Sequence, residues 1–184
     1  MIIYIHGFGS SGYGGKASQF REYFKSKGKA FIAPSLSYVP ELAIKTLEEL
    51  IESYNGEVQL IGSSLGGYYS LYLSQKYNLK AVLINPSIHP YITLAKVLGD
   101  AYNYYDETTF RWEASHIKML EQYKSGEVNQ KNIILLLQKG DESLDFNEAV
   151  NKLPQSHQIV EEGGSHSFDN VQRHFELVEN FFKS

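Results

Sequence analysis

The sequence has no cysteine among its 184 residues. The lack of thiols excludes disulfide bonds, thiolate metal sites and a cysteine nucleophile, and it fits a reducing compartment. Long hydrophobic runs are also missing, because the longest purely aliphatic stretch covers only residues 133–137. A membrane-spanning helix needs about 20 apolar residues. Since no basic segment precedes an apolar one at the N-terminus, no signal peptide is expected either. These absences predict a cytoplasmic protein without a membrane span.

An excess of basic residues is missing as well. The chain carries 17 basic and 21 acidic residues, which gives a formal net charge of −4. Nucleic-acid-binding domains normally carry a basic stripe, so we expect no nucleic-acid partner. The length suits one ordinary domain that buries about 70% of its unfolded surface. We therefore expect residues 1–184 to form a single domain.

Short apolar runs alternate with longer segments of helical periodicity along most of the chain. This alternation predicts an α/β fold in which helices cover both faces of a parallel sheet, forming three layers. The expected strands are residues 2–5, 30–33, 58–61, 81–84, 133–138 and 158–161, and the expected helices are residues 16–27, 41–54, 65–77 and 146–152. A final helix is expected from an apolar stripe that runs from Phe168 to Phe182 at spacings of three and four residues.

The segment 87–131 interrupts this rhythm after the fourth strand. It is too long for an ordinary connection of a few residues, and it is rich in tyrosine. Residues 113–123 within it are compatible with a helix. The segment is either a small lid over one end of the sheet or an ordinary surface excursion with its own hydrophobic cluster.

Residues 7–12, GFGSSG, match the pattern of a dinucleotide-binding loop and follow the first expected strand. That site needs an acidic residue at the end of the second strand, where it binds the ribose hydroxyls. No Asp or Glu lies between Ser26 and Pro40. A phosphate loop ending at Gly15 and Lys16 fails at two of its four fixed positions. We therefore expect no nucleotide cofactor, and none of another kind is indicated.

The segment GSSLG, residues 62–66, is a G-x-S-x-G pattern between a strand and a helix. A nucleophile on such a sharp turn adopts a strained backbone, and the flanking glycines relieve crowding. Ser64 is therefore the candidate nucleophile. The amide of Leu65 would lie at the start of the helix, where it can stabilise the oxyanion of an acyl-transfer reaction.

A serine hydroxyl needs a base to remove its proton, and that base needs an acid to orient it. After the fifth and sixth expected strands come Asp141 and His166, in the order serine, acid, histidine that this kind of fold requires. The carboxyl ends of parallel strands share one sheet edge, so these residues would meet Ser64 there. Asp145 is the alternative acid.

The other histidines indicate no metal site. His89 and His116 lie in the segment 87–131 and could line a pocket. No pair of histidines has the spacing of two metal ligands on one helix. We therefore predict no bound metal.

Several motifs in order resemble the α/β-hydrolase superfamily and, within it, the compact YqiA-like esterases. These motifs are HGF at residues 6–8, GSSLGG at 62–67, NPS at 85–87, GDE at 140–142 and GGSHSF at 163–168. The resemblance implies a six-stranded parallel sheet of order 2-1-3-4-5-6. It also implies that Phe8 gives its amide to the oxyanion hole and that His6 orients this loop.

These features together predict a serine hydrolase that cleaves a small-molecule carboxylic ester or thioester through Ser64, Asp141 and His166. A peptidase or an acyltransferase would use the same three residues. A second hypothesis is a hydrolase-fold protein that binds a small molecule without turnover, because a fold alone does not establish activity.

Overall fold

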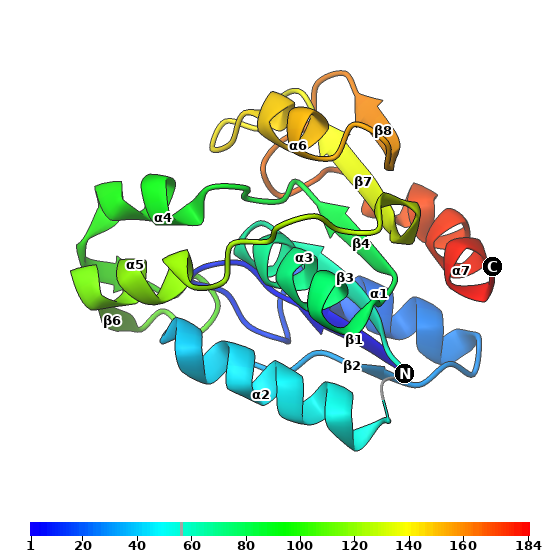
Figure 1. Ribbon diagram of the computed structural model, residues 1–184, viewed down its shortest axis with the longest axis horizontal. Helices are drawn as coiled ribbons and strands as arrows, with labels where there is room; N and C mark the ends of the chain where they lie inside the picture. The colour runs from blue at the N-terminus through cyan, green and yellow to red at the C-terminus, as the bar shows by residue number, and fades with distance from the viewer. Residues whose placement is uncertain (56) are drawn as a thin grey trace.

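The computed structural model describes residues 1–55 and 57–184, and its centre is a six-stranded sheet (Figure 1). The strand order is β2-β1-β3-β4-β7-β8, and every neighbouring pair is parallel. Counted along the chain without the separate hairpin β5–β6, this order is 2-1-3-4-5-6, which confirms the prediction. The strands are β1 (Ile2–Ile5), β2 (Phe31–Ile32), β3 (Gln59–Ser63), β4 (Ala81–Ile84), β7 (Ile133–Gln138) and β8 (His157–Glu161).

The central strands read as continuous apolar runs because both faces of the sheet are covered. All residues of β1, β4 and β7 are buried, whereas β8 at the edge is only half-buried. Side chains alternate between the two faces of a strand. In β1, Ile3 and Ile5 therefore enter one apolar cluster, and Ile2 and Tyr4 enter the other.

Five helices cover the sheet and complete the three predicted layers. Phenylalanines of α1 and α7 pack together in one apolar cluster, and Phe20 lies 4.7 Å from Phe175 between ring centroids. Figure 1 shows these two helices together on one side, whereas α2 and α3 contribute to the other cluster. The helices are α1 (Gly15–Ser26), α2 (Pro40–Ser53), α3 (Leu65–Tyr77), α6 (Phe146–Lys152) and α7 (Phe175–Lys183).

The start of the last helix differs from the sequence prediction. Phe168 has a left-handed φ of 62°, so it belongs to a turn and not to a helix. A 3-10 turn, η3 (Val171–His174), follows it and leads into α7. Phe168 and Val171 are buried in the same cluster as Val178 and Phe182. The apolar spacing therefore predicted correctly that these residues are buried, but the prediction of a helical backbone at Phe168 was wrong.

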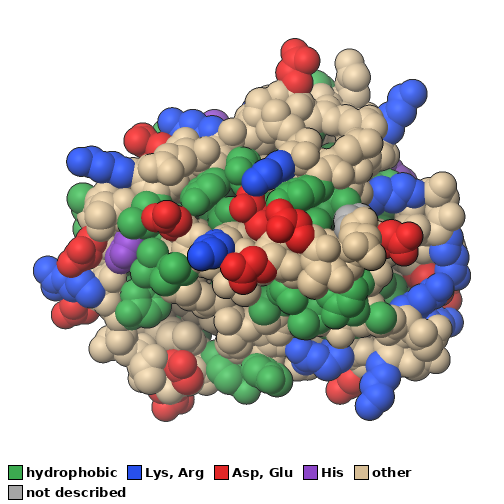
Figure 2. Space-filling model, turned by 60° about the horizontal axis from the view of Figure 1, so that its bottom comes forward, with side chains coloured by type: hydrophobic (Ala, Val, Ile, Leu, Met, Phe, Trp, Pro, Cys, Tyr) green, Lys and Arg blue, Asp and Glu red, His purple; other side chains and the backbone are tan. Residues whose placement is uncertain are grey.

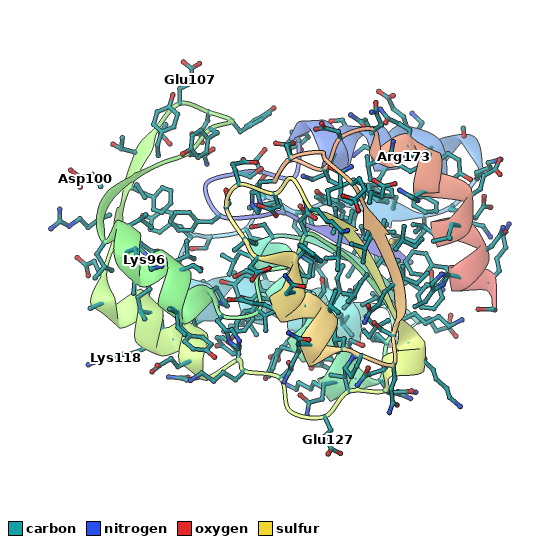
Figure 3. The ribbon with its side chains drawn as sticks, turned by 90° about the horizontal axis from the view of Figure 1, so that it is seen from above. Lys96, Asp100, Glu107, Lys118, Glu127 and Arg173 are labelled. Carbon is teal, nitrogen blue, oxygen red and sulfur yellow. The ribbon has the colours of Figure 1, made fainter. Side chains whose placement is uncertain are left out.

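The segment 87–131 forms a layer of short elements beside the sheet. They are α4 (Pro90–Thr93), η1 (Leu94–Val97), β5 (Gly99–Tyr102), β6 (Thr109–Trp112), α5 (Ala114–Glu121) and η2 (Gln130–Asn132). The antiparallel hairpin β5–β6 is not anticipated by the sequence analysis. Figure 3 shows Glu107, in the hairpin turn, pointing away from the molecule.

Apolar contacts join this segment to the main core. Trp112 is fully buried, and its indole N–H donates to the carbonyl of Leu94 at 3.1 Å. Trp112 and Leu120 belong to the same cluster as Leu60 and Leu83 of the central sheet. The buried apolar residues of the segment thus pack with those of the sheet in one cluster.

On the face that Figure 2 presents, basic and acidic side chains lie interspersed among apolar ones. Within residues 1–55 and 57–184, no helix combines the length and apolar character that crossing a bilayer requires.

The crossing of α3 over β1 gives a stability prediction. A Cβ atom on Gly66 would lie 2.0 Å from the carbonyl oxygen of Ile5, which belongs to backbone that cannot easily move. We expect Gly66→Ala to lower the free energy of unfolding by about 3 kcal/mol, because overpacking displaces the helix from the sheet. For a chain of this length, that loss corresponds to about 10 °C in melting temperature.

Gly15→Ala is the matched control, because nothing lies within 4 Å of the added Cβ atom. Its stability should change by less than about 1 kcal/mol. Urea and thermal unfolding followed by circular dichroism measure both variants. Equal midpoints for the two variants would show that α3 is not held against β1 as described.

Candidate active site

Ser64 lies on the sharp turn that joins β3 to α3. Its backbone has φ 55° and ψ −120°, a conformation that a residue with a side chain rarely adopts. The Ser64 amide donates to the carbonyl of Ile84 at 3.1 Å, and the Ser64 carbonyl accepts from Ser87 at 3.0 Å and from Gly67 at 2.9 Å. These bonds hold the strained turn in place. Such strain persists where the surrounding structure fixes it, and it is common at functional sites.

The imidazole of His166 lies between Ser64 and Asp141. Nε2 of His166 is 3.0 Å from Oγ of Ser64, and Nδ1 is 2.8 Å from Oδ2 of Asp141. A carboxylate only accepts hydrogen bonds, so Nδ1 carries the proton and Nε2 can accept one. The three residues come from loops after β3, β7 and β8, at the same sheet edge. The structure thus brings together the three side chains singled out by the sequence.

The carboxylate of Asp141 is enclosed, with only 3% of its side chain exposed. Its Oδ1 accepts from the amides of Ser143 at 2.8 Å and Leu144 at 2.9 Å. Burial alone would raise the pKa of Asp141, but the hydrogen bonds from His166 and from these amides outweigh it and lower the pKa. Asp141 is therefore ionised at neutral pH and suited to fix the orientation of His166.

Asp145, the alternative acid, has another role. Its Oδ1 accepts from the Asn147 amide at 2.9 Å and caps the first turn of α6. Of the two acids, only Asp141 contacts His166 in the part of the chain that the structure describes.

Two buried polar residues, to which the sequence analysis assigns no role, hold the loop carrying His166. Oε1 of Gln138 accepts from the amides of Ser165 at 3.1 Å and Asp169 at 2.8 Å. Nδ2 of Asn85 donates to the carbonyl of Ser165 at 2.9 Å. Oδ1 of Asn85 accepts from the Gln138 amide at 3.0 Å, so the two residues form one network. In the sequence, each of them is a polar residue at or just after the end of an apolar run, and Asn85 also begins the motif NPS.

Phe8 and Leu65 line one cavity together with Ser64 and His166. Leu65 is the first residue of α3, so its amide has no acceptor within the helix. The amide of Phe8 donates no hydrogen bond to any of the described residues. Both residues thus line the cavity, and neither amide is paired within the loop or helix that carries it.

His6 fixes the loop that carries Phe8. Its Nε2 accepts from the Leu36 amide at 2.9 Å, and its Nδ1 lies 2.8 Å from the carbonyl of Gly7. Burial lowers the pKa of His6 more than its bond to Gly7 raises it, so the ring stays neutral at pH 7. A neutral ring can accept at Nε2 and donate at Nδ1, which joins this loop to the chain after β2.

The cavity at Ser64 has a volume of about 500 Å³, and the segment 87–131 lines one side of it with mostly apolar residues together with Ser87, Thr93 and Asp100. Pro90, Leu94, Val97 and Tyr102 contribute to that side. His89 and His116 do not line it: His89 pairs with the Tyr91 hydroxyl, and His116 closes a capping box at the start of α5. A substrate held at Ser64 would thus have apolar surface on the side of the inserted segment.

The titratable side chains of the described residues form no cluster of three or more that is arranged to hold a metal ion.

Known proteins of similar structure have the α/β-hydrolase fold. The alpha/beta hydrolase domain-containing protein 10 from mouse superposes with a TM-score of 0.80 at 20% identity, covering 99% of this chain and 89% of that chain. An esterase domain of a Rhodothermus marinus protein superposes with a TM-score of 0.70 at 14% identity, covering 98% and 85%. These similarities establish the fold.

Sequence comparison gives the family. A UPF0227 protein of Vibrio parahaemolyticus is 27% identical over 186 residues, which cover 98% of both chains. The model of the uncharacterised protein family UPF0227 matches residues 1–183. The chain, an α/β hydrolase by fold, therefore belongs to the UPF0227 family.

Proposed function

We propose that this protein is a serine hydrolase that cleaves a carboxylic ester or an acyl thioester through an acyl-enzyme intermediate. The observation that carries the proposal is the hydrogen-bonded chain from Asp141 through His166 to Ser64. The esterase domain with the same fold supports it as a reaction class. The open cavity beside Ser64 gives a small-molecule substrate room to bind.

In the first half of the reaction, Oγ of Ser64 bonds to the acyl carbon while its proton moves to Nε2 of His166. The carbonyl oxygen becomes an oxyanion that accepts from the amides of Phe8 and Leu65. One such donor is worth about 3 kcal/mol of transition-state stabilisation. The tetrahedral species then breaks its C–O or C–S bond, and the leaving group takes the proton from Nε2.

In the second half, a water molecule enters the site after the alcohol or thiol has left and reacts with the acyl-enzyme. His166 removes a proton from water, the hydroxide oxygen bonds to the acyl carbon, and the bond to Ser64 breaks with return of the proton to Oγ. Asp141 stabilises the imidazolium in both halves. The segment 87–131 supplies apolar surface for the acyl chain.

A fluorophosphonate probe tests this proposal directly. Oγ of Ser64 should bond to phosphorus with loss of fluoride, because His166 activates the hydroxyl and the amides of Phe8 and Leu65 donate to the phosphoryl oxygen. Tandem mass spectrometry should find the adduct on the Ser64 peptide. His166→Ala should label at least about 100-fold more slowly, since general-base assistance is typically worth this much.

Ser63→Ala serves as control, because it removes the neighbouring hydroxyl and leaves Ser64 in place; it should label like the wild type. A folded wild-type protein that takes no label, yet binds a small molecule saturably, would instead be a binding protein. An adduct on another serine would refute the assignment of Ser64.

A further inference from the structure

A second cavity, of about 740 Å³, also reaches Ser64 and His166. Its remaining wall comes from the glycine-rich loop 7–15, the first turns of α1 and residues 167–172. The segment 87–131 contributes only Tyr104 to it. Because both cavities contain the reacting pair, a substrate bound at Ser64 has room for one part in each. The second cavity is therefore part of the surface that selects the substrate.

Lys16 brings a positive charge into this second cavity. Its ammonium donates to the carbonyl of Ser167, the residue after His166, at 2.6 Å. Among the described residues, no carboxylate lies within ion-pair distance of this ammonium, and it makes no other hydrogen bond. An ammonium has three donors, so two remain available beside the catalytic histidine.

The start of α1 adds backbone donors to the same wall. Helix α1 begins at Gly15 after Gly14, which gives no side-chain cap. The amides of Gly15, Lys16 and Ala17 therefore have no partner within the helix, and all three residues line the cavity. The dipole of this helix favours a negative group at the same end.

A polar atom without a partner also borders this cavity. Oε1 of Gln19 is buried and makes no hydrogen bond with the described residues, although Gln19 lines the cavity. A buried amide oxygen without a partner costs about 1–3 kcal/mol. The wall is thus more polar than the side formed by the inserted segment.

The negative charges nearby limit what this wall can bind. Asp141 is enclosed and bound to His166, so it is not presented to the cavity. Glu142 lines the cavity, and its Oε2 accepts from the His166 amide at 3.0 Å. The cavity suits a singly charged anion better than a doubly charged one, because no second lysine or arginine among the described residues lines it to compensate another negative charge beside Glu142.

We propose that Lys16 and the first amides of α1 bind a carboxylate of the substrate, so that the protein acts on esters or thioesters that carry a carboxylate near the scissile bond. This inference rests on the proposed function, because it assumes that Ser64 is the point of attack. It assigns the glycine-rich loop a role beyond the Phe8 amide: the loop forms the wall against which the charged part of the substrate lies.

Two pairs of esters test the inference, one for each side of the scissile bond. The acyl-side pair is the mono-p-nitrophenyl ester of glutarate and p-nitrophenyl valerate. The alcohol-side pair is the butyrate ester of p-hydroxybenzoate and that of p-hydroxybenzamide. The wild type should prefer the carboxylate in one of the pairs by about tenfold in kcat/KM, as one charge-assisted hydrogen bond provides.

Lys16→Met should abolish that preference by lowering kcat/KM about tenfold more for the carboxylate ester than for the neutral ester, whereas Lys16→Arg keeps the charge and should retain most of the preference. A wild type without preference in either pair would overturn the inference. So would an equal loss on the neutral and charged esters in Lys16→Met, because that result identifies Lys16 as a structural tie to Ser167.

A binding measurement separates this inference from the proposed function. Ser64→Ala removes the nucleophile, and the butyramides of p-aminobenzoate and p-aminobenzamide are unreactive analogues of the alcohol-side pair; glutarate monoanilide and valeranilide serve for the acyl side. Calorimetry should show about tenfold tighter binding of the carboxylate analogue on the side that Lys16 faces. If Lys16→Met in this background erases the difference, the inference holds even when no ester is cleaved. Equal binding of both analogues on both sides overturns it.

The preference should also depend on pH. Partial burial lowers the pKa of Lys16 to about 8, although Asp141 acts in the opposite direction. Since the ammonium is charged below this pKa, the carboxylate preference should be full at pH 7 and decline as the pH rises through 8. The ratio of kcat/KM for the two esters of a pair cancels titrations that affect both. The other titratable groups that line the cavity or lie behind it are Tyr4, Tyr104, Asp141, Glu142 and His166. A ratio that stays constant from pH 7 to 9 would contradict the role of the ammonium.

Discussion

Ser64→Ala is expected to lower kcat for a p-nitrophenyl ester by about 10⁶-fold, the loss seen when the nucleophile of a triad is removed. Alanine lacks the hydroxyl that bonds to the acyl carbon, and the remaining amides of Phe8 and Leu65 stabilise only an oxyanion that water must form unaided. Steady-state kinetics of the purified variant, with active-site titration of the wild type, measure the ratio.

Circular dichroism and the melting temperature accompany these kinetics. Alanine has the same backbone preferences as serine at a φ of 55°, so the strained turn is retained and the variant should melt close to the wild type. Ser63→Ala should stay within about tenfold of the wild-type rate, because Ser63 is not part of the hydrogen-bonded chain from Asp141 through His166 to Ser64. Activity of Ser64→Ala at the level of Ser63→Ala would disprove the assignment of the nucleophile.

Asp141→Asn should lower kcat by about 10⁴-fold, because the amide can donate to Nδ1 and thereby favours the wrong tautomer of His166. In that tautomer Nε2 carries the proton and cannot accept the one from Ser64. Asp145→Asn is the matched control: asparagine caps α6 as well as aspartate does, so this variant should keep wild-type kinetics. Equal losses in the two variants would refute the assignment of the acid.

Asp141→Asn should also change how the stability of the protein depends on pH. The folded protein lowers the pKa of Asp141 from its ordinary value of 3.8. A depressed pKa contributes stability above the unfolded pKa, and this contribution is lost as the pH falls through the folded one. Asp141→Asn has no such carboxylate, so its unfolding free energy should decline less steeply below pH 4. Urea unfolding of the wild type and of Asp141→Asn at pH 3 and pH 7 measures the difference. An equal change in unfolding free energy between the two pH values in both proteins would contradict the ionised state of Asp141.

The sheet was predictable because its strands carry their own signal. Residues 81–84 and 133–138 are continuous apolar runs, as expected of strands buried on both faces. The hairpin of β5 and β6 carries no such signal, because Asp100, Tyr102 and Arg111 are exposed and only Ala101 and Trp112 of its two strands are buried. Its pairing depends on packing against Phe8, whose ring lies 4.9 Å from that of Trp112. Contacts between residues so far apart in the sequence cannot be predicted from a local sequence pattern.

The candidate site was predictable for a related reason. Ser64, Asp141 and His166 each follow a strand, and parallel strands end at one edge of a sheet, so their order along the chain already places them together. The roles of Gln138 and Asn85 were not predicted, because these side chains act through hydrogen bonds with backbone groups and not through their own reactivity. Those partners lie in loops that meet only after folding. Lys16 entered the sequence analysis only as the lysine of a phosphate loop, because its contact with Ser167 beside His166 arises only on folding.

The contact between the glycine-rich loop and the hairpin bears on how the site forms. The Tyr104 amide donates to the carbonyl of Gly9 at 2.8 Å, and a Cβ atom on Gly9 would lie 2.5 Å from the carbonyl oxygen of Tyr102. The loop beside Phe8 is thus held by chain that leaves the ribosome about a hundred residues later, at roughly 5–20 residues per second. A nascent chain that ends before the hairpin has its glycine-rich loop unsupported. Hydrolytic competence would therefore arise late in synthesis, when residues from the first and last parts of the chain have met, and no N-terminal fragment should possess it.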